Sequence, residues 1–391
     1  MLITNVKIYT MNDADEVIDK GYILIKNGII NGIGKMEAAP SEESEIIDMK
    51  GALAYPGLID AHNHLGVFGE SSSSSDGNED TDPITPQLRV IDAIDTDNIY
   101  FSQAVRAGIT TVVVSPGSSN PIAGQISAIK TSAAGCRIDD MIVKEKVAIK
   151  FALGENPKSS YYDKDQMPAT RMGIAALIRE TLEKASRYEK QKQSAESDGK
   201  QSDLPEYDPK NEALIPLIRR EISAHFHAHT AGDIYTALRL AREFNIRAVI
   251  VHGTEGHRIC SDLKNECEGV LSGPILTDIS KPELKNLTPS SAGIMSANGI
   301  PVAIITDHPE TPVNHLIICV AAAVRGGMDR NNALRAITSE PARICGIFDR
   351  VGSLETGKDA DIVFFRDDPL NITVPSLCTI IGGKIVYSDS E

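Results

Sequence analysis

The sequence predicts an α/β fold: a (β/α)8 barrel with a small β-sandwich domain built from both ends of the chain. Eight short apolar runs lie in the middle of the chain, and most are separated by segments with helical periodicity. Alternating strands and helices indicate parallel βαβ units, and eight such units form a closed barrel. We predict domain boundaries at residues 1–55 and 346–391 for the β-sandwich domain and 56–345 for the barrel.

Both chain ends have the pattern of short strands joined by turns. In the first fifty residues, valine and isoleucine alternate with polar residues, and Asn-Gly pairs at 27–28 and 31–32 indicate tight hairpin turns. Residues 352–369 and 378–389 have the same strand–turn–strand pattern. We therefore expect the two ends to meet in one β-rich domain.

The expected barrel strands are apolar runs that end in polar residues. They span residues 54–64, 108–117, 124–135, 146–155, 221–229, 246–253, 268–273 and 300–309. Clear helical patterns cover residues 170–190 and 231–245.

Two segments interrupt this rhythm. Residues 71–75 are five serines in the loop after the first barrel strand, which we interpret as a solvated loop, with a lid over the active-site face as the alternative. Residues 186–210 are charged and poor in hydrophobic side chains, which predicts a helix end followed by a surface insertion.

Composition restricts the class of protein. The formal net charge is −15, which argues against nucleic acid or an anionic membrane surface as the partner. Six cysteines occur without a C-x-x-C pair, no signal peptide is evident and no run of about 18 apolar residues exists, so we expect a cytoplasmic protein with reduced thiols. We expect a small-molecule substrate and leave a homo-oligomer open.

Metal-type ligands occur at the ends of five expected strands. The first strand ends in His62 and His64, the fourth in Glu155, the fifth in the run HFHAH, the sixth in His252 and the eighth in Asp307. Singly, each has an ordinary explanation, such as a hydrogen-bonded core histidine or a helix cap. Because the carboxyl ends of barrel strands meet at one face, the set predicts a site for zinc, manganese or iron.

Four sequence motifs accompany these ligands: PGLIDAHNH, VHG, ITDHP and the tail SEPARICGIFDRVGSLETGKDADIVFF. They resemble motifs of the amidohydrolase superfamily, and they are nearest to its imidazolonepropionase-like branch. The resemblance implies a distorted TIM barrel that holds one or two divalent ions and hydrolyses a C–N bond. Zn²⁺ is the expected ion, with Mn²⁺ or Fe²⁺ as alternatives.

The resemblance also implies roles for individual residues. His62, His64 and Asp307 would bind the more buried ion. His227 and His252 would bind the second ion or, in a mononuclear site, share the first.

The family's strand-five ligand is the first histidine of a His-Ala pair. His227 fits this pattern better than His225 or His229, although His229 stays open as the ligand. Binuclear relatives bridge the ions with a carboxylated lysine or a glutamate. For that role we predict Glu155, with the alternatives Lys130 and Lys150.

A bound divalent ion lowers the pKa of water toward neutrality, which makes hydroxide available. Asp307 would accept the proton and return it to the leaving nitrogen. Thr230 stands where deaminases and imidazolonepropionases of the family have a glutamate, which weakens both of those interpretations. The expected substrate-binding residues are His229, His257, Arg171, Asn120 and Gln125.

The leading hypothesis is a metal-dependent amidohydrolase that acts on a small substrate such as an N-acyl amino acid, a dipeptide or a cyclic amide. The alternative is a deaminase of a cyclic amidine, which would release ammonia. A third hypothesis is a catalytically silent barrel scaffold, against which the intact ligand set argues.

Overall fold

The computed structural model describes residues 1–41, 45–69, 75–131, 136–199 and 201–389. Four of the five serines in the run 71–75 therefore lie outside the described residues, and the loop or lid predicted there stays a prediction. No helix in the described part of the chain has the length and apolar character that crossing a membrane requires.

The larger sheet is a nearly closed barrel, as the sequence predicts. Its eight strands are neighbours in chain order. They are β6 (Leu58–Asn63), β7 (Ile109–Val114), β8 (Ile122–Lys130), β9 (Ile142–Ala152), β10 (Ser223–Ala228), β11 (Arg247–His252), β12 (Gly269–Ser272) and β13 (Val302–Ile304).

Backbone hydrogen bonds connect β6 to the segment that follows β13. The N–H of Asp307 donates to the carbonyl of His62 at 3.2 Å, and the N–H of His64 donates to the carbonyl of His308 at 2.9 Å. The first and last strands are thereby joined at the residues that the sequence singles out as ligands.

The strands are not all parallel, which corrects the expectation of eight parallel units. Strand β8 is antiparallel to both β7 and β9, while the other neighbouring pairs are parallel. The connections on either side of β8, residues 115–121 and 131–141, are shorter than the dozen or more residues that a parallel crossover needs. The chain therefore turns back instead of crossing over.

Alternation along β10 assigns its side chains to two faces. Ala224, Phe226 and Ala228 belong to the apolar core that the barrel shares with its helices. The histidines at the intervening positions face the barrel interior, because successive side chains of a strand point to opposite sides. Residues such as Ile59 and Val251 form a separate apolar cluster.

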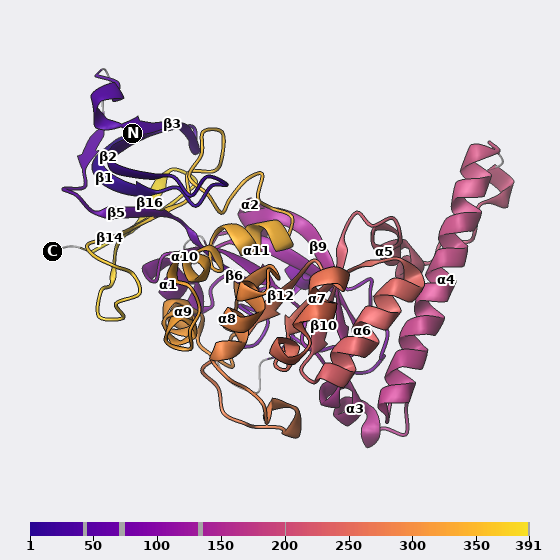
Figure 1. Cartoon of the computed structure of the whole chain (residues 1–391). Coiled ribbons are helices and arrows are strands. Elements are labelled where there is room, and N and C mark those ends of the chain that lie inside the picture. Colours follow the sequence, from indigo (N-terminus) through magenta and orange to yellow (C-terminus); the bar gives the residue numbers. More distant parts are fainter. Residues whose placement is uncertain (42–44, 70–74, 132–135, 200, 390–391) are drawn as a thin grey trace.

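Helices surround the barrel (Figure 1). They are α1 (Ile99–Arg106), α2 (Ile138–Met141), α3 (Glu155–Tyr162), α4 (Arg171–Ser197), α5 (Pro209–Ile218), α6 (Ala231–Phe244), α7 (Cys260–Glu266), α8 (Ser290–Ala297), α9 (Leu316–Arg325), α10 (Arg330–Arg335) and α11 (Ser339–Ile344).

Helix α4 is longer than the sequence predicts. It continues to Ser197, well into the segment expected to be an insertion, and extends away from the barrel (Figure 1). Lys184 and Arg187 form ion pairs with glutamates one turn before them, and Lys192 pairs with Glu212 of α5 at 2.7 Å. These pairs support a helix whose far end is rich in charged side chains.

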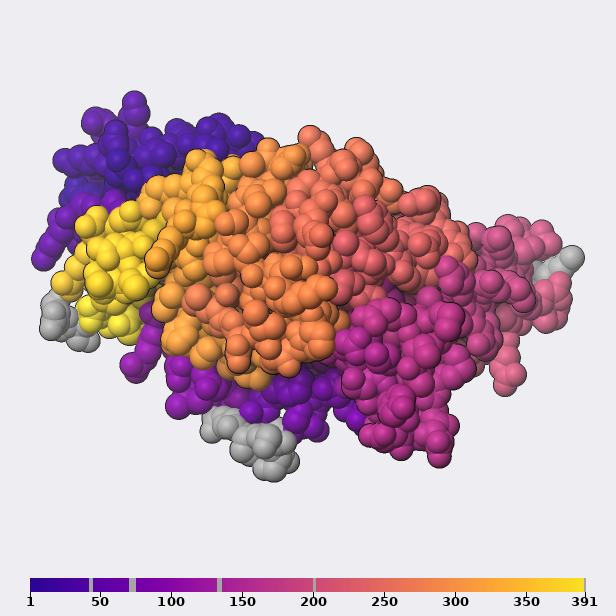
Figure 2. Space-filling model, turned by 60° about the horizontal axis from the view of Figure 1, so that its bottom comes forward, coloured from indigo at the N-terminus to yellow at the C-terminus, as the bar shows by residue number. Residues whose placement is uncertain are grey.

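The two chain ends form the second sheet together, as predicted. Its strands are β1 (Leu2–Tyr9), β2 (Val17–Lys26), β3 (Ile29–Lys35), β4 (Ile46–Asp48), β5 (Leu53–Pro56), β14 (Ile362–Phe365), β15 (Ser376–Ile381) and β16 (Lys384–Ser388). Strand β14 joins the ends by pairing with β5. Figure 2 shows the indigo and yellow ends together, far from the magenta α4 region.

The hairpin between β2 and β3 turns at Asn27 and Gly28, which both have positive φ, as the first Asn-Gly pair predicts. The second pair, at 31–32, lies within β3 and forms no turn. The domain boundaries after residues 55 and 345 stay predictions.

Candidate metal centre

The first candidate metal cluster consists of His62, His64 and Asp307. Asp307 Oδ1 lies 3.6 Å from His62 Nε2 and 3.4 Å from His64 Nε2. His64 Nδ1 lies 2.7 Å from the carbonyl of Ser115, which requires a hydrogen on Nδ1 and leaves the Nε2 lone pair directed at the cluster. Three donor atoms therefore converge from two strands that are far apart in the sequence.

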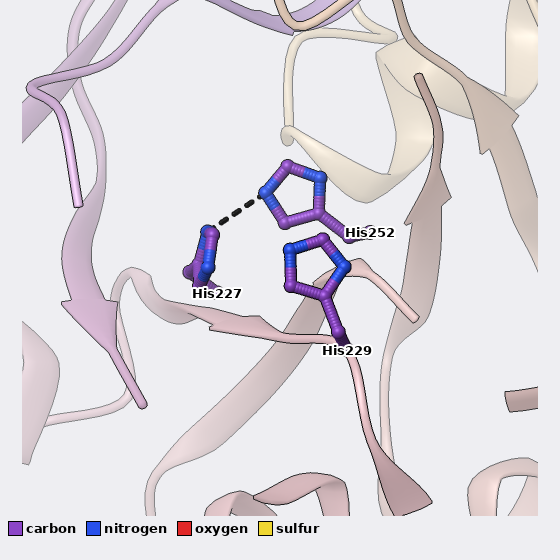
Figure 3. Close-up of side chains that lie close together, drawn as sticks. All are labelled: His227, His229 and His252. Atoms are coloured by element: carbon purple, nitrogen blue, oxygen red, sulfur yellow. Dashed lines mark hydrogen bonds between the residues drawn. The ribbon is translucent and has the colours of Figure 1, made fainter. Parts of the chain in front are cut away.

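The second cluster consists of His227, His229 and His252 (Figure 3). His252 Nδ1 lies 2.7 Å from the carbonyl of Gly273, so that Nδ1 carries the hydrogen and Nε2 offers a lone pair. His252 Nε2 accepts a hydrogen bond from His227 Nδ1 at 2.8 Å (Figure 3). This bond leaves the lone pair of His227 on Nε2.

Two of these ligand residues have a left-handed backbone conformation, which orients their side chains. His252 has a φ of 71° and Asp307 a φ of 53°, a conformation uncommon for residues other than glycine. Each residue stands where a strand ends, so the turn redirects its side chain toward the cluster. Backbone strain of this kind is characteristic of functional sites.

Lys150 contacts the first cluster, which lies beside the second. Its side chain is completely buried, and its Nζ lies 3.0 Å from His62 Nε2. The clusters are adjacent, since the ring centres of His62 and His252 are 5.9 Å apart and His252 Nδ1 is 4.0 Å from Asp307 Oδ2. Burial lowers the pKa of Lys150 to about 7.

Burial keeps the histidines neutral. Loss of solvent lowers the pKa values of His62, His227 and His229 well below their ordinary range, that of His225 to about 3 and that of His252 to about 4. A neutral imidazole has the lone pair that a metal ion requires.

Unpartnered nitrogens are a second sign of a missing ligand. His227 Nε2 and His229 Nε2 are buried in the described structure without a hydrogen-bond partner. Buried polar atoms are normally paired, and those that are not require an explanation such as a bound ion. Nitrogen and carboxylate donors without cysteine suit an open catalytic site for a divalent ion, so the residues fit the predicted metal.

A cavity of about 440 Å³ opens onto both clusters. His64 and Asp307 reach it from the first cluster, and His227 and His229 from the second. The remaining wall is rich in hydroxyl groups, and its described members include Ser118, Ser119, Ser159, Ser160, Thr277 and Ser280.

Known proteins share this architecture. The model of the amidohydrolase family matches residues 275–387. A solved structure of an amidohydrolase from Thermotoga maritima MSB8 superposes with a TM-score of 0.94 at 37% identity, covering 99% of this chain and 100% of that one. The chain belongs to the amidohydrolase family.

The chain also matches parts of more distant relatives. Amidohydrolase tasK from Hapsidospora irregularis is 27% identical over 395 residues, which cover 94% of this amidohydrolase but 40% of tasK. A 5-methylthioadenosine/S-adenosylhomocysteine deaminase from Bacillus anthracis is 44% identical over 62 residues, which are 16% of this chain and 14% of the deaminase. The matched segments thus cover less than half of either relative. Its assignment to the imidazolonepropionase-like branch stays a prediction.

The structure brings together most of the ligands that the sequence singles out in this amidohydrolase. His62, His64 and Asp307 form one cluster, and His227 and His252 belong to the other. His229, which the sequence leaves open as ligand or substrate-binding residue, joins the second cluster and also lines the cavity.

Glu155, the predicted bridge, lies in neither cluster. It is the first residue of α3, and its carboxylate pairs with Lys158 at 2.8 Å and Arg171 at 3.0 Å. Gly154, with a φ of +86°, turns the chain at the end of the strand, so Glu155 heads the helix instead of continuing β9. Of the two lysines that the sequence offers as alternatives, Lys150 is at the clusters.

The other predicted substrate-binding residues do not line the cavity in the described structure. Arg171 pairs with Asp233 at 2.9 Å, and His257 Nδ1 lies 3.2 Å from Ser291 Oγ. Asn120 donates to the hydroxyl of Thr85, and Gln125 to the carbonyl of Pro86. Sequence reasoning missed Lys281, which does line the cavity, because its neighbours form no recognisable motif.

Proposed function

We propose that this chain is a metal-dependent hydrolase that cuts the C–N bond of an amide in a small molecule. The observation that carries the proposal is the pair of adjacent clusters, His62–His64–Asp307 and His227–His229–His252, at one end of the barrel beside a cavity. Active sites of such barrels lie at the carboxyl ends of the strands.

When bound, divalent ions polarise a carbonyl oxygen and make hydroxide available near neutral pH. Asp307 performs the proton transfers in this proposal. Its carboxylate faces the cavity, and although burial opposes ionisation, His252 and His64 hold its pKa below the ordinary value. The ionised carboxylate takes a proton from the attacking water and returns it to the nitrogen that leaves.

Lys150 takes the bridging position in this proposal, in place of Glu155. A lysine serves this role once its amine has added carbon dioxide: an N–C bond forms, a proton leaves, and the side chain ends in a carboxylate. The placement of Lys150 beside His62, in the cluster adjacent to His252, supports this role. Without an anion between them, two neighbouring divalent ions would repel each other strongly.

The zinc content of purified protein tests the proposal. We expect between about one and two equivalents of metal per chain after dialysis. A chelator should remove the metal and abolish amide hydrolysis, and added Zn²⁺ or Mn²⁺ should restore both the metal content and the activity. His62→Asn should lower the metal content, whereas His315→Asn, the same change outside both clusters, should not. Wild-type protein that retains less than about a tenth of an equivalent and rebinds neither ion contradicts the proposal.

Deamination of a cyclic amidine is the second candidate function. The local similarity to the deaminase favours it, although it covers only 62 residues. Release of ammonia, in place of an amine or an opened ring, would identify this reaction.

A further inference from the structure

Lys281 stands in the wall of the cavity. Its Nζ donates to Asn156 Oδ1 at 3.0 Å and lies 2.9 Å from Glu283 Oε1. An ammonium group has three N–H donors, so these contacts leave at least one for a ligand. Among the described residues that line this cavity, Lys281 is the one lysine or arginine.

Glu283 contacts Lys281 on the side away from the cavity. The Glu283 side chain is buried and does not line the cavity in the described structure. Its Oε2 accepts the N–H of Glu155 at 3.1 Å, and its Oε1 lies 3.7 Å from His229 Nε2. Glu283 is therefore a positioning residue for the lysine, while a ligand in the cavity meets the ammonium.

The position of Glu283 depends on a glycine. A Cβ added to Gly154 would lie 2.7 Å from Glu283 Oε2, and the φ of +86° at Gly154 also favours glycine. The turn after β9 thus leaves room for the carboxylate. This arrangement orients one cation toward the cavity.

We propose that Lys281 binds a carboxylate on the substrate, so that the amide carries a carboxylate close to the bond that is cut. This inference rests on the proposed function. A carboxylate accepts a charge-assisted hydrogen bond from an ammonium group, and its second oxygen can accept from a wall hydroxyl. The acidic groups of the wall are Asp307, in the first cluster, and Glu310, an exposed residue in the same loop. N-Acyl amino acids and dipeptides have the required chemistry.

The opposite charge would be disfavoured at this position. An amine in place of the carboxylate would face Lys281 without access to Glu283, which is covered. A neutral amide would lose the charge-assisted bond but keep the hydroxyl contacts. The site should therefore distinguish a carboxylate from its matched amide.

N-Acetyl amino acids and the matched N-acetyl amino acid amides test this inference. Acetate release gives kcat and KM, and titration calorimetry gives affinity independently of turnover. We expect the carboxylates to be favoured by about 10- to 100-fold, through KM and affinity. Lys281→Met should remove the preference by raising KM, and Lys281→Arg should retain it. The control Lys285→Met, a change at an exposed lysine of the same loop, should leave it unchanged.

A second variant protects the test from misfolding, because Lys281→Met leaves a buried carboxylate without its cation. Lys281→Met with Glu283→Gln removes both charges and should also lose the preference. The inference is overturned if wild-type protein shows no preference, if it binds no carboxylate of the panel, or if both variants keep the preference. The metal content of wild-type protein, measured separately, decides whether the proposed function fails with it.

Discussion

Two buried lysines in neighbouring strands of the barrel have opposite surroundings. Lys130, at the end of β8, contacts Asp361 and lies 2.8 Å from Asp359, which also pairs with Arg350. Lys150, in β9, lies among neutral histidines, with its Nζ 3.0 Å from His62 Nε2. Lys130 thus has carboxylate partners, whereas Lys150 is surrounded by histidine nitrogens.

The difference separates stability from function. Around Lys130, the charges of the lysine and its partners neutralise each other, and the ion pairs connect the barrel to the segment that leads into β14. These groups therefore require no further ligand. Around Lys150, buried nitrogens are left without partners, an arrangement that is costly unless something else binds. The predictions below test this contrast, from the largest expected effect to the smallest.

Asp307→Asn should have the largest effect, at the Lys150 end of the barrel. Asparagine can coordinate weakly through its oxygen but cannot accept a proton, so we expect turnover of an identified amide to fall by about two to four orders of magnitude. Circular dichroism and metal analysis should show a folded protein that keeps most of its metal. Near-normal turnover would show that another group moves the proton.

Lys130→Met should destabilise the fold strongly, because it leaves the buried carboxylate of Asp361 without its cation. We expect a loss of about 3–5 kcal/mol in the free energy of unfolding, measured by denaturant titration. Lys20→Met, at an exposed lysine, is the control and should change it by less than about 0.5 kcal/mol. A stable Lys130→Met protein would remove the contrast between the two lysines.

Lys150→Met should have the opposite effect: a small change in stability and a large change in metal content. In metal-free protein the free energy of unfolding should fall by less than about 1 kcal/mol, because methionine fills a similar volume and needs no partner. Metal content should fall from about two equivalents to about one. An unchanged metal content would argue that Lys150 is not the bridge.

Glu155→Gln should have the smallest effect. Its carboxylate pairs with Lys158 and Arg171 at a partly exposed position, so stability should change by less than about 1 kcal/mol. Metal content should stay the same. If this variant, and not Lys150→Met, loses one equivalent, the bridging role returns to the glutamate that the sequence predicts.

The sequence by itself determined the parts of this protein that depend on local pattern. Short apolar runs predicted the eight barrel strands. Because the carboxyl ends of parallel strands meet at one end of a barrel, His62, His64, His252 and Asp307 could be assigned to one site before any distance was known.

Only the tertiary structure decided what depends on distances between residues far apart in the chain. Lys130 and Lys150 both stand in barrel strands, and only their neighbours, Asp361 for one and His62 for the other, distinguish them. The cavity position of Lys281 depends on contacts with Asn156, more than a hundred residues away in the chain. Periodicity and spacing describe single strands and helices. Charge pairing and desolvation act between elements, and the folded chain sets them.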